Sequence, residues 1–177
     1  GNIDFTGNVT VKGSIADGME VKAKGNVLVS GSIHGATIEA GGQVVIEKGF
    51  IGLNKGKIKS QGNVEVKFVE NATVITEGDL IVKDAIMHSN VDAGEKIILN
   101  QNKGLIVGGK LRATKEIDAK IIGSNLATPT EISVGITPEL RDDFREKDNR
   151  FKDQQEKLDE VIKNKKALTK MREEKGG

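Results

Sequence analysis

The sequence predicts an all-β parallel β-helix followed by one long, charged α-helix. Three observations carry this prediction. A short phrase of alternating apolar residues recurs through the first two thirds of the chain, glycine makes up 22 of its 177 residues, and a later segment combines high charge with no glycine. Repeats with a period of about 20 residues are the signature of solenoid architectures, in which each repeat forms one coil.

The repeated phrase reads apolar-x-small-x-Gly-x-apolar-x-apolar, and residues 21–29 show it in full. Glu95 and Lys115 replace the glycine in the last two copies, which keep the apolar positions. The spacings between copies are 18, 17, 20, 16, 17 and 20 residues, which predicts about seven coils of 16–20 residues within residues 1–136. The first apolar residues of the copies are Ile3, Val21, Ile38, Ile58, Val74, Val91 and Leu111.

Alternation with a period of two places every second side chain of a strand on one face. Equivalent strands of successive coils then stack in parallel about 4.8 Å apart, which makes seven coils about 34 Å long. We expect the recurrent glycine at a corner, where a positive φ favours a residue without a Cβ atom. The small residues that precede this corner are expected to point inward: Ala23, Ala40, Ser60, Thr76, Ala93 and Ala113.

A second series of apolar residues predicts another strand in each coil. The series consists of Ile15, Ile33, Ile51, Val69, Ile86, residues 105–107 and residues 121–122. A left-handed hexapeptide helix has a regular period of about 18 residues, whereas the coil lengths here vary. We therefore favour a right-handed β-helix, in line with the usual handedness of parallel crossover connections.

Residues 137–175 predict a long α-helix that forms a coiled-coil arm. Thr137 is expected to cap the helix, with Pro138 at the first helical position. Residues 138–175 hold 12 Lys or Arg and 11 Asp or Glu. A heptad pattern gives a narrow apolar stripe that needs a partner helix to cover it, although Lys147, Gln154, Lys165 and Arg172 interrupt it. The predicted coiled-coil interface consists of Phe144, Phe151 and Leu158 at a positions and Leu140, Val161 and Leu168 at d positions.

Composition argues against several classes of partner. The 27 basic and 26 acidic residues leave a net charge of +1, so the whole molecule is not drawn to nucleic acid or to a membrane surface. Trp and Tyr, on which bases would stack, are absent. The sequence contains no run of 18 apolar residues, so it predicts no direct membrane insertion. Cysteine is absent, which excludes disulfides and thiolate zinc sites.

Residues that carry catalysis or bind cofactors in other proteins are isolated in this sequence. His34 and His88 are the only histidines, and no further ligands follow at a metal-binding spacing. We expect His88 to stabilise a turn. No phosphate-binding loop motif occurs, and acids such as Glu47, Glu65 and Asp84 are scattered. The sequence therefore predicts no catalytic residue, no cofactor, no metal ion and no small-molecule substrate.

Several segments, taken in their order along the chain, resemble the bacterial flagellar assembly protein A (FapA) family. They are residues 1–9, 35–42, 56–59, 69–74, 88–94, 103–109 and 131–135, followed by residues 138–140. Members of this family usually carry a domain before this region and a returning helix after it, so we expect the chain to be part of a longer protein. The resemblance implies a non-catalytic cytoplasmic scaffold in flagellar assembly or polar organisation. Its expected partners are further copies of the chain or other proteins of flagellar or polar assembly.

Two other classes of function remain open from the sequence alone. Bare ends of a β-helix can stack end to end, as in a bactofilin-like cytoskeletal polymer. A polysaccharide-acting β-helix enzyme is the third class, and the lack of aromatic platforms disfavours it. The long charged helix fits a defined oligomer better than an open polymer.

Overall fold

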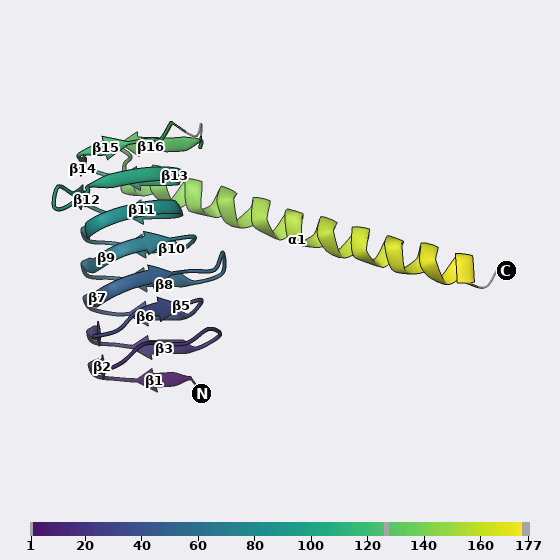
Figure 1. Ribbon diagram of the computed structural model, residues 1–177, viewed down its shortest axis with the longest axis horizontal. Helices are drawn as coiled ribbons and strands as arrows, with labels where there is room; N and C mark the ends of the chain where they lie inside the picture. Colours follow the sequence, from purple (N-terminus) through teal and green to yellow (C-terminus); the bar gives the residue numbers. More distant parts are fainter. Residues whose placement is uncertain (1, 126–127, 175–177) are drawn as a thin grey trace. The chain divides into compact units, whose positions relative to one another are not determined.

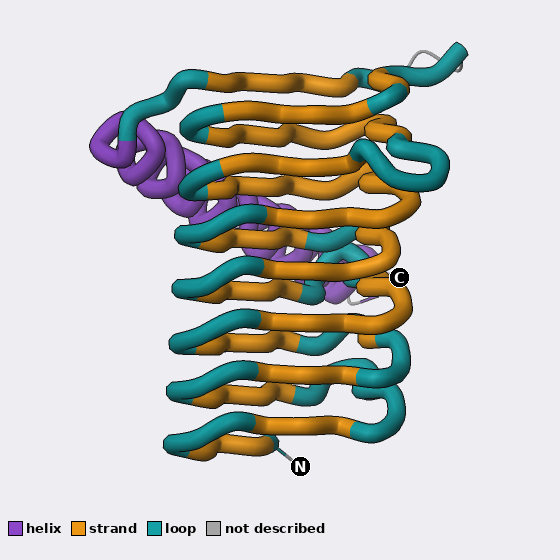
Figure 2. Tube along the Cα trace, turned by 90° about the vertical axis from the view of Figure 1, so that its left-hand side faces the viewer, coloured by secondary structure: helices purple, strands orange, loops and turns teal. Residues whose placement is uncertain are grey.

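The computed structural model describes residues 2–125 and 128–174 and confirms a parallel β-helix of about seven coils. The chain divides into two units, Gly1–Ile136 and Thr137–Gly177, which are described separately below. Within the described residues, the first unit holds the strands β1 to β16 and the second unit holds the helix α1 (Figure 1). The strands of successive coils lie one above another along the stack (Figure 2).

Each coil has three sides, which we call the first, second and third faces. The first face consists of β1 (Ile3–Phe5), β3 (Glu20–Ala23), β6 (Thr37–Ala40), β8 (Lys57–Ser60), β10 (Thr73–Thr76), the ends of β11 (Leu80–Ala93) and β13 (Leu105–Ala113), and β16 (Thr130–Val134). The second face consists of β2 (Val9–Val11), β4 (Val27–Val29), the starts of β7 (Val44–Ile51), β9 (Val64–Glu70) and β11, then β12 (Lys96–Leu99) and β14 (Glu116–Ala119). The third face consists of β5 (Ile33–His34), the ends of β7 and β9, the middle of β11, the start of β13, and β15 (Ile121–Ile122).

The register of the first face follows the repeated phrase. Ile3 pairs with Val21, Val21 with Ile38, and each later first residue with the next, through Val91 and Leu111. All these pairings are parallel, so the predicted stacking is confirmed. Leu111 pairs in turn with Ile132 of β16, which adds one more strand to this face. The handedness of the β-helix stays a prediction.

The core runs through the middle of the stack as a column of inward side chains. The second face contributes inward Val and Leu residues such as Val44 and Leu80, and the third face contributes Ile33 and Ile86, all with 0% exposure. Burial of apolar surface at about 25 cal/mol per Å² is the main stabilising contribution here. The small residues expected to point inward are all buried: Ala23, Ala40, Ser60, Thr76, Ala93 and Ala113.

The third face has Phe50 as its inward residue in the third coil, next to Ile51 of the predicted apolar series. Phe50 is fully buried and pairs with Ile33 of the preceding coil. Ile51 is only half-buried and points outward. The physical reason is stacking between coils, since Phe50 lies in register between the buried residues Ile33 and Val69. A slip of one residue moves a side chain to the opposite face of a strand.

The recurrent glycines are needed because neighbouring coils approach closely at these positions. The prediction that they have a positive φ is wrong. Gly25, Gly42, Gly62 and Gly78 are not among the described residues with positive φ. A Cβ atom on Gly62 would lie 2.9 Å from the nitrogen of Gln43 and 2.9 Å from the carbonyl carbon of Gly42. Both atoms belong to the backbone of the preceding coil, so they cannot move aside without disturbing the stack.

We expect Gly62→Ala to lower the free energy of unfolding by about 1–3 kcal/mol, the usual range for forcing an extra methyl group into a packed site. Gly13→Ala is the matched control, because a Cβ atom there meets nothing within 4 Å. That control is expected to be neutral or to stabilise by about 0.4–1 kcal/mol through the unfolded state. Urea unfolding followed by far-UV circular dichroism measures both. Equal effects of the two substitutions would contradict the close-approach explanation.

The second unit consists of α1 (Pro138–Glu174), which has 37 residues. At 1.5 Å per residue such a helix is about 56 Å long. The backbone N–H of Leu140 donates to Oγ1 of Thr137 at 3.3 Å, which confirms Thr137 as the N-cap. Hydrogen bonds from its own backbone N–H and from the Thr137 hydroxyl lower the pKa of the Glu139 carboxyl. A negative charge in the first turn also stabilises the helix dipole.

Candidate interaction surfaces

The predicted coiled-coil residues form an exposed stripe on α1, which we call the α1 seam. Its members are Leu140, Phe144, Phe151, Leu158, Val161 and Leu168. Phe144 is half-buried and the other five are exposed, with Phe151 and Leu168 each at 67% exposure. Residues three, four and seven apart lie on the same side of a helix, so the seam runs along the helix. Exposed apolar stripes of this kind mark surfaces that bind another protein.

Ile162 extends the α1 seam and was missed by the sequence analysis. It lies four residues after Leu158, and 42% of its surface is exposed. The heptad pattern assigned the d position to its neighbour Val161, so Ile162 was left out of the predicted interface. The helical period of 3.6 residues would have found it, since a spacing of four residues keeps two side chains on one side.

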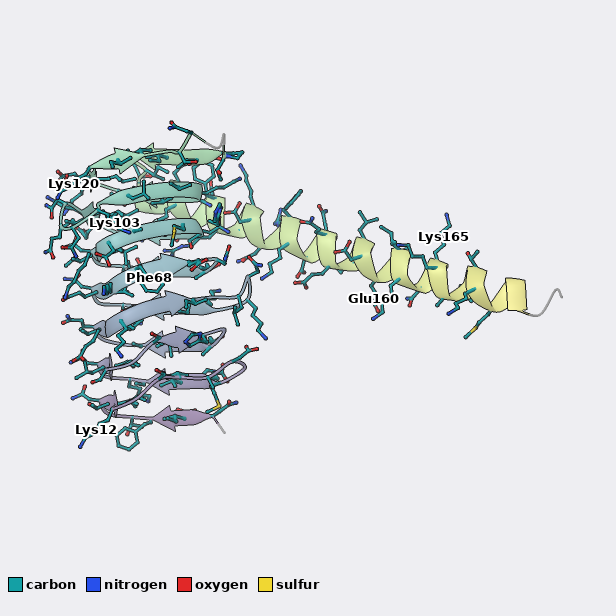
Figure 3. The ribbon with its side chains drawn as sticks, in the orientation of Figure 1. Lys12, Phe68, Lys103, Lys120, Glu160 and Lys165 are labelled. Carbon is teal, nitrogen blue, oxygen red and sulfur yellow. The ribbon has the colours of Figure 1, made fainter. Side chains whose placement is uncertain are left out.

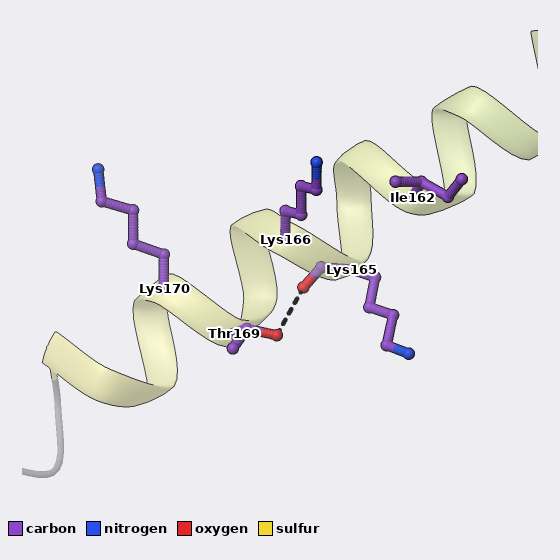
Figure 4. A pocket seen from close by; sticks show the side chains of 5 residues that line it. All are labelled: Ile162, Lys165, Lys166, Thr169 and Lys170. Atoms are coloured by element: carbon purple, nitrogen blue, oxygen red, sulfur yellow. Dashed lines mark hydrogen bonds between the residues drawn. The ribbon is translucent and has the colours of Figure 1, made fainter.

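The remaining surface of α1 is polar and ionic. Arg150 and Glu146 form an ion pair at 2.6 Å, with the spacing of four residues that stabilises helices. Figure 4 shows a hollow lined by Ile162, Lys165, Lys166, Thr169 and Lys170. The Thr169 hydroxyl in it donates to the carbonyl oxygen of Lys165 at 2.9 Å. The hollow therefore offers ammonium groups on a helix surface and no carboxylate or imidazole for acid–base chemistry.

The outer side of the first face carries a ladder of alternating charges. Asp4, Lys22, Glu39 and Lys59 occupy equivalent positions in four successive coils. Lys22 Nζ also lies 3.0 Å from Glu20 Oε1. The hydrogen bond and the charge of Glu20, followed by the charge of Glu39, raise the pKa of Lys22. Opposite charges on neighbouring strands stabilise the stacking and leave this face with little net charge.

The histidines occupy separate places on the β-helix. His34 ends β5, and His88 is exposed within β11. His88 has a φ of 48°, which places it at a left-handed corner between the third and first faces. The adjacent Ser89 supplies hydrogen bonds at this corner: its hydroxyl donates to the Met87 carbonyl at 2.7 Å and accepts from Ala72 N–H at 3.2 Å. Among residues 2–125 and 128–174, no group of three His, Cys, Asp or Glu side chains could hold a metal ion.

The acids singled out in the sequence include two that join neighbouring coils. Glu65 lies 3.0 Å from Lys83 in the next coil. Asp84 accepts a hydrogen bond from Asn102 at 2.7 Å. Glu47 is exposed at the corner within β7. Glu65 and Asp84 therefore take part in ion pairing and hydrogen bonding between coils, which accounts for their presence without a reaction.

Comparison with known proteins gives one match. No curated protein and no solved structure matches the chain. Within the part of the chain that the structure describes, no helix is both long enough and apolar enough to pass through a membrane. The family model of the Flagellar Assembly Protein A beta solenoid domain matches residues 1–177, which is the whole chain. The parallel β-helix and the full-length match lead to one conclusion: the chain belongs to the FapA beta solenoid family.

Proposed function

We propose that the chain is a non-catalytic scaffold of flagellar assembly or polar organisation in the cytoplasm. Membership of a flagellar assembly family supports the role. The observation that carries the scaffold mechanism is the exposed α1 seam, because a lone helix cannot bury such a stripe. A coiled coil covers a and d residues by packing them against a second helix. The proposed partner helix is α1 of another copy, which makes the chain a homo-oligomer that displays its β-helices to other proteins of flagellar or polar assembly.

Sedimentation velocity across a concentration series tests this proposal. A discrete small oligomer that dissociates on dilution is the expected result, since a seam of a few apolar residues gives a finite and reversible association. A monomer at every concentration would contradict self-association through α1. Growth into ever larger species would contradict a defined oligomer.

A bactofilin-like polymer is the second candidate, and one observation favours it. Ile3 and Phe5 of β1 are exposed, at 37% and 54%, and β1 pairs only with β3 among the described residues. An unpaired strand edge with apolar side chains can template stacking on another copy. Filaments in negative-stain electron micrographs would support this candidate. Their absence at concentrations where the discrete oligomer forms would leave the scaffold as the explanation.

A further inference from the structure

The outer side of the third face carries an apolar patch, unlike the charged outer side of the first face. We call it the third-face patch, and it consists of Ile51, Phe68, Met87, Leu105, Val107 and Ile121. These residues flank the inward residues of their strands, so alternation points them outward. Ile121 is 54% exposed and the others are half-buried. Apolar patches on a protein surface mark candidate binding sites for another molecule.

Most members of the third-face patch stack in register, and Glu70 separates Ile51 from Met87 in one of the two outward rows. Phe68 pairs with Ala85, Ala85 with Leu105, and Leu105 with Ile121. Met87 pairs with Val107 in the adjacent outward row. The ring of Phe68 also lies across Gly49 of the preceding coil, where a Cβ atom would collide with it. The patch is therefore a packed apolar surface that spans neighbouring coils.

One border of this patch is lined with lysines, which we call the lysine edge. Figure 3 shows Lys12, Lys103 and Lys120 along one side of the coils. The edge lies at the corner between the second and third faces and consists of Lys12, Lys48, Lys67, Lys83, Lys103 and Lys120. Its six lysines outnumber the nearby acids, which are Glu47, Glu65, Glu70, Asp84 and Asp118.

Most of the lysine edge is available to a partner. Lys83 lies 3.0 Å from Glu65, and Lys67 lies 4.0 Å from Asp84. The other four lysines are exposed and form no ion pair with an Asp or Glu among the described residues. Lys120 Nζ donates a hydrogen bond to the carbonyl oxygen of Asn102 at 3.0 Å. These uncompensated ammonium groups attract an acidic partner to the side of the apolar patch.

An α-helix suits this surface better than a strand does. The backbone N–H and C=O groups of the third face already bond between coils, so a strand laid on the face would find no partners for its own backbone. A helix satisfies its own backbone and needs only side-chain contacts. Its pitch of about 5.4 Å is close to the coil spacing of about 4.8 Å, so successive turns can meet successive coils.

We propose that the third face binds an acidic amphipathic α-helix of a partner protein. The apolar side of that helix packs on the third-face patch, and its carboxylates lie along the lysine edge. Helix α1 of a second copy does not have this chemistry, because residues 138–175 hold 12 basic and 11 acidic residues and so have no acidic excess. The proposal rests on the scaffold role and adds the chemistry of the partner, at a surface separate from the α1 seam.

A peptide of about 16 residues tests the proposal, with Leu at i, i+3, i+4 and i+7 positions, Glu elsewhere and one Trp. The chain contains no Trp or Tyr, so the fluorescence of the peptide reports binding without background. A second peptide with Lys in place of Glu is the charge control. We expect the acidic peptide to bind at least about 10-fold more tightly than the basic one, and to weaken as salt screens the lysines.

Variants of the chain locate the binding site. Met87→Gln with Leu105→Gln removes part of the third-face patch, and Lys103→Glu with Lys120→Glu reverses part of the lysine edge. Each pair is expected to weaken binding of the acidic peptide at least about 10-fold, the effect of losing charge pairs and apolar contacts at an interface. The matched controls are Ile81→Gln with Ile98→Gln on the second face and Lys57→Glu with Lys59→Glu on the first. They are expected to change binding less than about twofold, because their side chains lie on the outer sides of the other two faces and not on the third face.

Several results would overturn the proposal once circular dichroism shows that the variants are folded. Equal binding of both peptides, or equal binding by patch variants and controls, would exclude an acidic helix site on the third face. Loss of self-association in the patch variants would assign the face to a second copy instead. Binding of vesicles that contain anionic lipid, without binding of the peptide, would assign it to a membrane surface. Peptide binding retained by a monomeric α1-seam variant would instead support the proposal, because it would show that the site does not depend on the oligomer of the proposed function.

Discussion

Phe50→Ala is expected to lower the free energy of unfolding by about 3–5 kcal/mol, the usual cost of removing a buried aromatic ring. Phe50 is fully buried and is the largest such side chain in the described core. Its pairing partners on the third face are Ile33 in the preceding coil and Val69 in the following one, and both are fully buried. The loss of the ring leaves a cavity that two stacked, hydrogen-bonded strands cannot close by moving together.

Ile51→Ala is the control for this substitution and tests the alternation of β7 directly. Ile51 is next in sequence and also apolar, but it points outward and is half-buried. Its truncation is expected to cost less than about 1 kcal/mol, as most surface substitutions do. Urea unfolding followed by far-UV circular dichroism measures both variants. A greater loss for Ile51→Ala than for Phe50→Ala would show that Ile51 fills the core and that the orientation of this strand is reversed.

The stacking of the coils was predictable from the sequence because one simple signal repeats. The apolar residue that opens each phrase, such as Val21 or Ile58, has the same neighbours in every coil. Period-two alternation then fixes which side chains face inward. The start of α1 was equally predictable, since Thr137 followed by Pro138 gives a local capping signal that does not depend on the rest of the fold.

Features that depend on contacts between coils could not be predicted in the same way. The glycine at Gly62 was assigned to a turn conformation, whereas its role is set by the backbone of residues 42 and 43 in another coil. The apolar series marked the strand by Ile51 without separating inward from outward residues, and stacking with Ile33 and Val69 makes Phe50 the inward one. Both features depend on how the coils align, and because the coils have different lengths, sequence spacing does not define that alignment at every corner.

The third-face patch and the lysine edge were hidden by the same variation in coil length. Lys12, Lys103 and Lys120 are far apart in sequence and follow no fixed period. They share one corner only after the coils are stacked. The apolar residues 105–107 were recognised as a strand, but the sequence did not separate inward Ile106 from outward Leu105 and Val107. Outward apolar residues can be recognised as one surface patch only when their neighbours in adjacent coils are known.

Phe151→Lys with Leu158→Lys on the α1 seam is expected to abolish self-association, with the dissociation constant rising at least about 100-fold. Each apolar side chain of this size contributes about 1.5–3 kcal/mol when buried, and about 2.7 kcal/mol corresponds to a 100-fold change in affinity. The added ammonium groups would also repel each other across a coiled coil. Sedimentation velocity measures the change, and urea unfolding of the β-helix is expected to stay the same because residues 1–136 form a separate unit.

Asn149→Lys with Ala167→Lys adds the same two charges to α1 at exposed f and c positions of the heptad, away from the seam. This control is expected to leave the oligomer within about threefold of its original affinity, since exposed charges contribute little at high dielectric. A difference between the two double variants would therefore come from the apolar seam and not from net charge. If both variants dissociated equally, the association would be electrostatic. If neither dissociated, another surface would hold the copies together, and the α1 seam would be left to a different partner.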